Sequence, residues 1–279
     1  MKKIYLGELK PLFGENEALQ MLNILIEHFF SLTRSQQALN INYRLNESEM
    51  LSLHNAVKEL KKNRPVQYIT GETEFYGLRF LVNSLVLIPR QETEELVDLI
   101  VKNEKSEGLK VLDIGTGSGC IAISIAKTLY NPKVSALDIS VSALAVAQNN
   151  AEINTVEVNF IEEDILNISQ NTETQFDIIV SNPPYVKMSE KELMQPNVLE
   201  YEPHLALFVE DDNPLKFYKA IVNYASENLK IKGRLYFEIN EALGKDVSEL
   251  TKAADFENVE IHLDINGKER MLSASKSAI

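Results

Sequence analysis

The feature that most limits the possible folds is the glycine-rich segment "DIGTGSGC" (Asp113–Cys120), which separates a strand-like stretch from a helix-like one. Before it, "KVLDI" (residues 110–114) has the β-branched and apolar residues of a buried strand. Gly115, Gly117 and Gly119 let the backbone turn sharply and approach a ligand, with helix N–H groups pointing at it. The segment therefore predicts a ligand-binding loop at the end of a strand.

Strands and helices alternate from this point to the C-terminus, and the alternation predicts a parallel, Rossmann-like α/β domain. We expect strands at residues 110–114, 133–139, 156–161, 176–180, 234–239, 259–265 and 269–275. We expect helices at residues 91–103, 119–130, 141–153, 214–230 and 242–255.

The first part of the chain has a different pattern. Apolar residues recur at helical spacing from residue 2 to about residue 63, which predicts a small helical bundle. The segment Pro65–Arg90 is rich in β-branched and aromatic residues, with Gly71 and Gly77 as turn formers, and it predicts a β-hairpin without helices. We therefore divide the chain into a helical domain (1–64), a β-hairpin connector (65–90) and an α/β domain (91–279).

Composition narrows the class of protein. The 279 residues are 44% hydrophobic, which suffices for a sizeable core, and neither a membrane span nor a signal peptide is evident, so we expect a cytoplasmic protein. Cys120 is a single cysteine and the four histidines are scattered, so we expect no disulfide and no metal site. The net charge of −13 argues against a large nucleic-acid surface and favours a protein or small-molecule partner.

The ligand class follows from the acids beside the glycine loop. Asp138 ends the next strand, 19 residues after Gly119, where a carboxylate can accept hydrogen bonds from two ribose hydroxyls. A dinucleotide fits these features, but Cys120 breaks the G-x-G-x-x-G spacing, and Asp113 suits a ligand with an ammonium group. S-adenosylmethionine has such a group and is the predicted cofactor; a tight turn that binds nothing is the alternative.

Asp164 ends the third expected strand in "FIEEDIL". At this position Asp164 can accept a hydrogen bond from the exocyclic amine of an adenine while Ile165 covers the ring. An ordinary surface acid in a run of three is an equally good interpretation.

The turn "SNPPYV" (Ser181–Val186) follows the fourth expected strand and therefore faces the same edge of the sheet as the glycine loop. The Asn182 side-chain oxygen and the Pro183 carbonyl can accept both N–H bonds of a planar amide or amino group and hold its poorly nucleophilic nitrogen in place. Pro183 and Pro184 keep these oxygens rigid, and the Tyr185 ring can lie against the flat acceptor. A loop without chemistry is the alternative.

With these motifs located, the chain resembles the HemK/PrmC family, S-adenosylmethionine-dependent methyltransferases that modify the side-chain amide of a glutamine in peptide chain release factors. The resemblance rests on seven segments in order: "RPVQYITGETEFYGLRFLV", "LIPRQETEELV", "LDIGTGSGCIAISIA", "SNPPYV", "EYEPHLAL", "LYFEIN" and "DINGKERML". It implies a class I methyltransferase fold with a seven-stranded sheet, preceded by helices that dock the release factor.

The resemblance also implies a set of site residues. S-adenosylmethionine is expected to border Gly115, Thr116, Gly117, Ser118, Gly119, Asp138, Ile165 and Asn182. Asp113 and Asp164 join this set on the sequence arguments given above. The substrate glutamine is expected at Asn182, Pro183, Pro184 and Tyr185, of which Asn182, Pro183 and Tyr185 are the candidate catalytic residues.

Two other functions remain open at this point. The same turn serves enzymes that methylate adenine or cytosine in nucleic acid, although the charge argues against them. A binding module that retains the pocket without activity is the other. The roles of four charged residues are also open between support of the site and ordinary surface or capping functions: Arg90, Glu92, Glu202 and Glu238.

Overall fold

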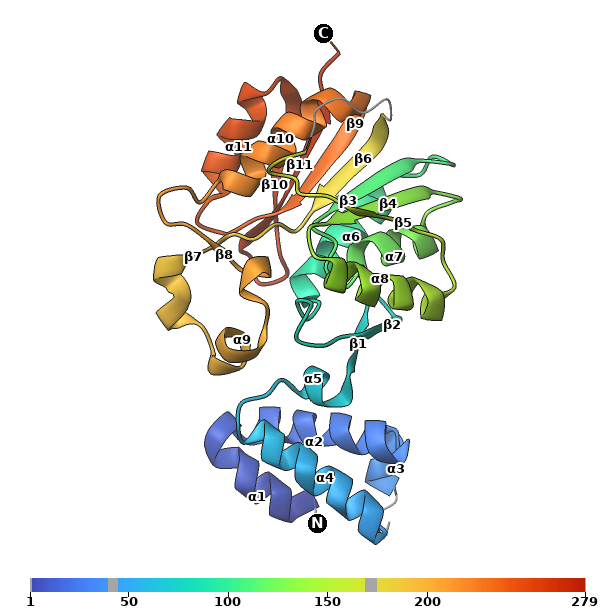
Figure 1. The fold of residues 1–279 in the computed structure, drawn as a ribbon, viewed down its shortest axis with the longest axis vertical. Helices are drawn as coiled ribbons and strands as arrows, with labels where there is room; N and C mark the ends of the chain where they lie inside the picture. Colours follow the sequence, from blue (N-terminus) through green and yellow to red (C-terminus); the bar gives the residue numbers. More distant parts are fainter. Residues whose placement is uncertain (1, 40–44, 169–174, 279) are drawn as a thin grey trace. The chain divides into compact units, whose positions relative to one another are not determined.

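The computed structural model describes residues 2–39, 45–168 and 175–278 (Figure 1). It divides into two compact units. The first consists of Met1–Glu72 together with Gln195–Tyr201, and the second of Thr73–Met194 with Glu202–Ile279. The chain therefore leaves the second unit, contributes seven residues to the first and returns.

The first unit is helical. Its helices are α1 (Lys2–Phe13), α2 (Glu15–Phe30), α3 (Arg34–Leu39), α4 (Glu47–Leu60), α5 (Val66–Thr70) and α9 (Pro196–Tyr201). Helix α4 begins at a capping box in which the Asn46 side chain accepts from the Glu49 N–H and the Glu49 side chain accepts from the Asn46 N–H. Apolar residues of α1, α2 and α4 form its core, among them Leu9, Leu22, Leu25, Leu53 and Leu60.

The prediction that the connector has no helix is wrong, because Val66–Thr70 form α5, which Gly71 ends in the left-handed conformation. Residues 40–44 of the predicted bundle lie outside the described residues.

The second unit opens with a hairpin and continues into a seven-stranded sheet. Strands β1 (Glu72–Phe75) and β2 (Leu78–Leu81) pair across Tyr76 and Gly77, both of which have positive φ, as a two-residue hairpin turn requires. The large sheet has the order β10-β11-β9-β6-β3-β4-β5. Its strands are β3 (Lys110–Ile114), β4 (Lys133–Asp138), β5 (Asn159–Glu162), β6 (Phe176–Ser181), β9 (Leu229–Glu238), β10 (Phe256–Leu263) and β11 (Glu269–Lys276).

The seven-stranded sheet expected for this fold class is present, but the domain predicted as parallel has a mixed sheet. Strands β3, β4, β5, β6 and β9 pair in parallel, but β11 is antiparallel to both of its neighbours, β9 and β10. A short turn around Gly267 joins β10 to β11, and a connection this short can join only antiparallel strands. The strand predicted at 156–161 begins three residues later, and the strand predicted at 234–239 begins at Leu229.

Helices cover both faces of this sheet (Figure 1). On one face, α6 (Gln91–Asn103), α7 (Cys120–Thr128) and α8 (Val141–Asn154) pack on an apolar layer; on the other, α10 (Lys216–Asn228) and α11 (Gly244–Ala253) pack on a second layer. Short elements β7 (Val186–Lys187), η1 (Met188–Leu193), η2 (His204–Ala206) and β8 (Phe208–Val209) surround α9 in the sequence. No helix within the described ranges is long and apolar enough to cross a membrane.

Candidate active site

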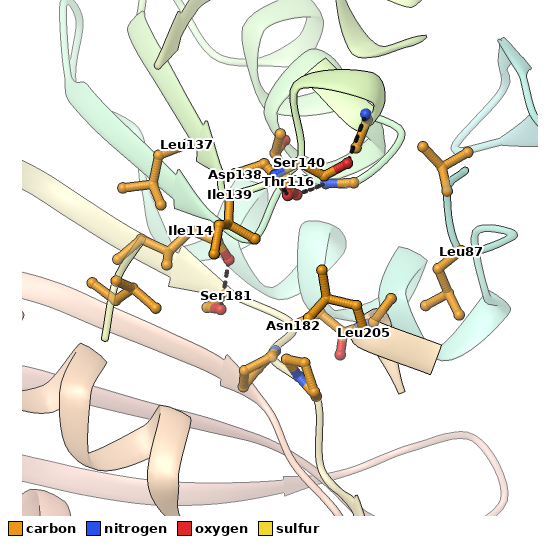
Figure 2. Close-up of a pocket in the computed structure, with 18 of the residues that line it drawn as sticks. Leu87, Ile114, Thr116, Leu137, Asp138, Ile139, Ser140, Ser181, Asn182 and Leu205 are labelled. Carbon is orange, nitrogen blue, oxygen red and sulfur yellow. Dashed lines mark hydrogen bonds between the residues drawn. The ribbon is translucent and has the colours of Figure 1, made fainter. Parts of the chain in front are cut away.

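A cavity opens at the edge of the large sheet where β3, β4 and β6 end (Figure 2). Its volume is about 270 Å³, close to the lower end of the range of about 300–1,000 Å³ that small-molecule sites occupy. Thr116, Asp138 and Asn182 line it together, although they lie at or just after the ends of three different strands. Apolar side chains complete the wall, including those of Leu87, Ile114, Leu137, Ile139 and Leu205.

The glycine loop connects β3 to α7 and lines the cavity at Gly115, Thr116, Gly117 and Ser118. The N–H groups of Gly115 and Thr116 both donate to the Leu137 carbonyl, at 2.9 and 3.0 Å, which ties the loop to β4. Gly115 and Gly117 have φ of 73° and 55°, and nothing lies within 4 Å of where a side chain would begin. The loop thus turns through conformations that favour glycine and leaves its backbone open.

Gly119 has a different reason to be glycine. Its φ is 81°, and a Cβ there would lie 2.9 Å from Ile123 Cδ1 and 3.1 Å from Ala147 Cβ. A side chain at this position would force Ile123 and Ala147 to shift, so close packing of the loop on α7 and α8 favours glycine. Gly119 is not among the residues that line the cavity.

Asp113 is buried below the loop and does not line the cavity, in contrast to the direct cofactor contact expected for it. Its Oδ2 accepts from Thr116 Oγ1 at 2.6 Å and from the Ala122 N–H at 3.2 Å, while Oδ1 has no partner among the described residues. Burial raises the pKa of Asp113 to about 7. The geometry assigns Asp113 to holding the loop against α7.

Asp138 ends β4 and faces the cavity, as Figure 2 shows. Its Oδ2 accepts from the Gly117 N–H and its Oδ1 from the Ser140 N–H, both at 2.9 Å. Burial raises the pKa of Asp138, and these backbone hydrogen bonds oppose the shift. The carboxylate is thereby fixed in orientation, and each oxygen retains a lone pair for a ligand hydroxyl.

Asp164 and Ile165 also line the cavity. Asp164 caps the turn that follows it, because Oδ1 accepts from the Leu166 N–H at 2.9 Å and Oδ2 from Asn167 Nδ2 at 2.6 Å. The structure therefore brings both predicted residues to the pocket and gives Asp164 a local structural function as well.

The proline turn begins where Ser181 Oγ donates to the Ile114 carbonyl at 2.7 Å, a bond that joins the ends of β6 and β3 (Figure 2). Asn182, Pro183 and Pro184 line the cavity, but Tyr185 is not among its lining residues. The Tyr185 hydroxyl instead donates to Glu238 Oε1 at 2.9 Å, and burial raises the pKa of Tyr185 well above its ordinary value.

One residue of the site escaped sequence reasoning altogether. Thr93, in the first turn of α6, lines the cavity and accepts a hydrogen bond from Asn182 Nδ2 at 3.2 Å. Its own hydroxyl donates to Glu238 Oε2 at 2.6 Å. A threonine near a helix start carries no distinctive signal, because this residue type is common in first turns and caps.

An ion pair supports the rim of the cavity. Arg90 Nη2 donates to Glu202 Oε1 at 2.6 Å, and the Ile88 N–H donates to Glu202 Oε2 at 3.2 Å. The Glu202 side chain is 1% exposed and that of Arg90, which lines the cavity, 35%. Of the two interpretations left open for these residues, the contacts favour support of the site.

The described residues contain no cluster of three or more His, Cys, Asp or Glu that could hold a metal ion. Burial raises the pKa of the pocket residue Cys120 to about 12, so its thiol stays protonated and is a poor nucleophile. The proline turn and Asp138 line the cavity with groups that can form hydrogen bonds with a ligand.

Comparison with known proteins identifies the class. Residues 91–200 match the methyltransferase small domain family, and residues 12–71 match the PrmC N-terminal domain family. A methyltransferase structure from Pyrococcus furiosus has a TM-score of 0.54 at 18% identity, covering 84% of this chain and 100% of that one. The structure of the T. thermophilus 16S rRNA methyltransferase in complex with AdoMet and guanosine also has a TM-score of 0.54 at 18% identity. The match covers 74% of this chain and 49% of that one. The structure match shows that the chain has the fold of class I methyltransferases, and the domain match assigns residues 91–200 to the methyltransferase small domain family.

Curated relatives narrow the class to a family. A release factor glutamine methyltransferase from Flavobacterium psychrophilum is 47% identical over 275 residues, which is 97% of this chain and 96% of the relative. One from Bacteroides thetaiotaomicron is 48% identical over 83% of each chain. The chain belongs to the release factor glutamine methyltransferase family.

Proposed function

We propose that this enzyme transfers a methyl group from S-adenosylmethionine to the side-chain amide nitrogen of a glutamine in a peptide chain release factor. One observation carries the proposal: Asn182, Pro183 and Pro184 line the same cavity as the glycine loop and Asp138. A rigid turn rich in acceptors thus borders the space that a cofactor of this class would occupy. The substrate class is supported by the names of relatives that align over almost the whole chain.

The residues on the cofactor side fit S-adenosylmethionine. Gly115 and Gly117 leave open backbone at the cavity, and Asp138 offers an oriented carboxylate for ribose hydroxyls. Ile139 and Ile165 provide apolar surface for a purine, with Asp164 close in sequence as an acceptor for its amine. When bound, the cofactor supplies an electrophilic methyl group on its sulfonium sulfur.

The acceptor side is suited to a primary amide. Pro183 and Pro184 have no N–H group, so the turn presents carbonyl oxygens without the donors that would otherwise accompany them. The Asn182 side-chain oxygen and the Pro183 carbonyl then accept the two N–H bonds of the glutamine amide. Orientation is the main requirement, because a delocalised amide nitrogen is poorly nucleophilic and a misplacement near 1 Å can cost about 10²-fold in rate.

The partner follows from the same reasoning. A net charge of −13 does not favour a nucleic-acid substrate, for which binding relies on Lys and Arg contacts with phosphates. We propose that the helical first unit contributes to docking the release factor, and that the reaction takes place in the cytoplasm, where release factors act on ribosomes.

The test uses three release factors that differ only at the target residue. With glutamine, we expect one added methyl group in the target peptide by mass spectrometry. With glutamate, we expect none, because an acceptor-only carboxylate would meet two acceptors. With asparagine, one methylene shorter, we expect only a trace. Methylation of the glutamate variant would exclude amide recognition, and label entering nucleic acid in a parallel reaction would indicate a different substrate class.

A further inference from the structure

A continuous hydrogen-bond chain runs from the core to the cavity through three residues of the second unit. Glu238, at the end of β9, is 1% exposed and Thr93 is 3% exposed. Thr93 Oγ1 donates to Glu238 Oε2 at 2.6 Å, and Asn182 Nδ2 donates to Thr93 Oγ1 at 3.2 Å. Asn182 is the last member and reaches the cavity.

The direction of this chain is dictated by the chemistry of its buried end. A carboxylate only accepts hydrogen bonds, and a hydroxyl has a single proton to donate. The Thr93 proton is therefore committed to Glu238, so Thr93 can only accept from Asn182. The NH₂ end of the Asn182 amide must face Thr93, and its oxygen must face away. If residue 238 were neutral, the Thr93 proton could turn toward Asn182, and the flipped amide would be equally well satisfied.

The surroundings of Glu238 hold its carboxylate in this role. Its second oxygen accepts from the Tyr185 hydroxyl at 2.9 Å. The pKa of Glu238 is raised by burial and by the charge of Glu92, and the bonds from Thr93 and Tyr185 and the charge of Arg270 oppose this rise. One buried carboxylate thus fixes both ends of the Asn182–Tyr185 turn.

We propose that Thr93 and Glu238 are positioning residues that set the orientation of the Asn182 amide, so that its oxygen and not its nitrogen is presented to the substrate. This inference rests on the proposed function, because a primary amide substrate needs an acceptor at that point. Thr93 acts through Asn182 and not on the reacting atoms.

The test is a double-mutant cycle on the full chain, with release factor and methyl-labelled S-adenosylmethionine under single-turnover conditions. Thr93→Val, which keeps the shape of threonine without its hydroxyl, should lower the rate constant about 10- to 10²-fold. The dissociation constant of S-adenosylmethionine should stay within about twofold, since the hydroxyl is committed to Glu238 and Asn182. Thr93→Ser should recover most of the lost rate.

The decisive measurement repeats Thr93→Val in an Asn182→Ala background. If Thr93 acts only through Asn182, Thr93→Val should lower the rate constant of the Asn182→Ala variant by less than about twofold. An equally large loss in both backgrounds, or no loss in the wild-type background, overturns the inference. Glu238→Gln is measured in the same two backgrounds. If Thr93→Val does not fold, the same comparison of rate losses is made with Glu238→Gln.

Two controls separate this inference from its premise. Thr251→Val removes another fully buried threonine hydroxyl, which donates to the Val247 carbonyl in α11 away from the cavity, and should leave the rate unchanged. If the wild-type protein methylates no release factor, the proposed function itself fails. If the wild type is active but Thr93→Val lowers the rate equally with and without Asn182, only the roles of Thr93 and Glu238 are refuted.

Discussion

The two sides of the cavity are built in different ways. The glycine-loop side consists mainly of backbone: positive φ angles at Gly115 and Gly117 and N–H bonds to Leu137 and Asp138 form it within a short stretch of chain. The asparagine side depends on side chains, since Asn182 is held by Thr93, 89 residues away. Thr93 in turn is held by Glu238, 145 residues away.

This difference predicts how each side of the cavity should respond to substitutions. A backbone-built side tolerates the loss of a single side chain, because most of its contacts remain. A side-chain-built side depends on each member, because removing one leaves the others free to reorient. We use this contrast to order the expected effects from largest to smallest, first on activity and cofactor binding and then on stability.

Asn182→Ala should lower kcat by about 10²-fold or more while the affinity for S-adenosylmethionine changes little, because the lost oxygen orients the substrate amide. Single-turnover methyl transfer and calorimetry with the cofactor measure the two quantities separately. A variant with near-normal turnover would remove Asn182 from the mechanism.

Asp138→Ala should weaken S-adenosylmethionine binding about 10- to 10²-fold, because two ribose hydroxyls lose a charged acceptor. Turnover at saturating cofactor should be much less affected. Asp164→Ala is the matched comparison and should cost less, since Asp164 is already engaged with Leu166 and Asn167. Equal losses in calorimetry for both variants would contradict the assignment of the ribose to Asp138.

Gly119→Ala and Gly117→Ala test the backbone-built side directly. At Gly119 the new Cβ meets Ile123 and Ala147 as well as an unfavourable φ, so we expect a loss of about 2–4 kcal/mol in the free energy of unfolding. At Gly117 only the φ is unfavourable, and about 1–2 kcal/mol should be lost. Denaturant titrations of the two variants should give this order; the reverse order would mean that packing at Gly119 is not limiting.

Asp113→Asn should produce the smallest effect, visible as a change in pH dependence. The pKa of Asp113 is about 7 in the folded protein, above its value in the unfolded chain. The folded state therefore binds this proton more tightly, and the stability it contributes is present at low pH and lost as pH rises toward 7. From pH 5 to pH 7 the free energy of unfolding of the wild type should therefore fall by about 1 kcal/mol or more beyond the fall seen for the variant. Parallel pH profiles for the two proteins would contradict a buried, proton-binding Asp113.

The position of the glycine-loop side could be predicted from the sequence, because its determinants are local. Gly115, Gly117 and Asp138 lie beside strand ends, and the strand pattern alone places those ends at one edge of a sheet. Their contact with a cofactor stays a prediction. Thr93 could not be found in this way, because its importance lies in partners that only the folded chain brings together. Glu238 was recognised as a possible supporting acid, but its hydrogen bond with Thr93 was not predicted.

The fold shows the same division. Most predicted strands and helices are present, since hydrophobic periodicity sets them locally. The direction of β11 and the helix α5 were not predicted, because strand direction depends on how the chain returns to the sheet and because the aromatic and β-branched residues of 66–70 suggest a strand. Strand pairing at the sheet edge is thus decided by topology rather than by composition.

The excursion of the chain at Gln195–Tyr201 matters for anyone who wishes to shorten the protein. These residues belong to the first unit, where the Tyr201 hydroxyl donates to the Lys62 carbonyl at 2.7 Å. A fragment that starts at Thr73 would therefore contain helix α9 but not the helices of the first unit, to which α9 belongs. A clean excision needs two edits, one at the hairpin and one that replaces residues 195–201 by a short polar linker.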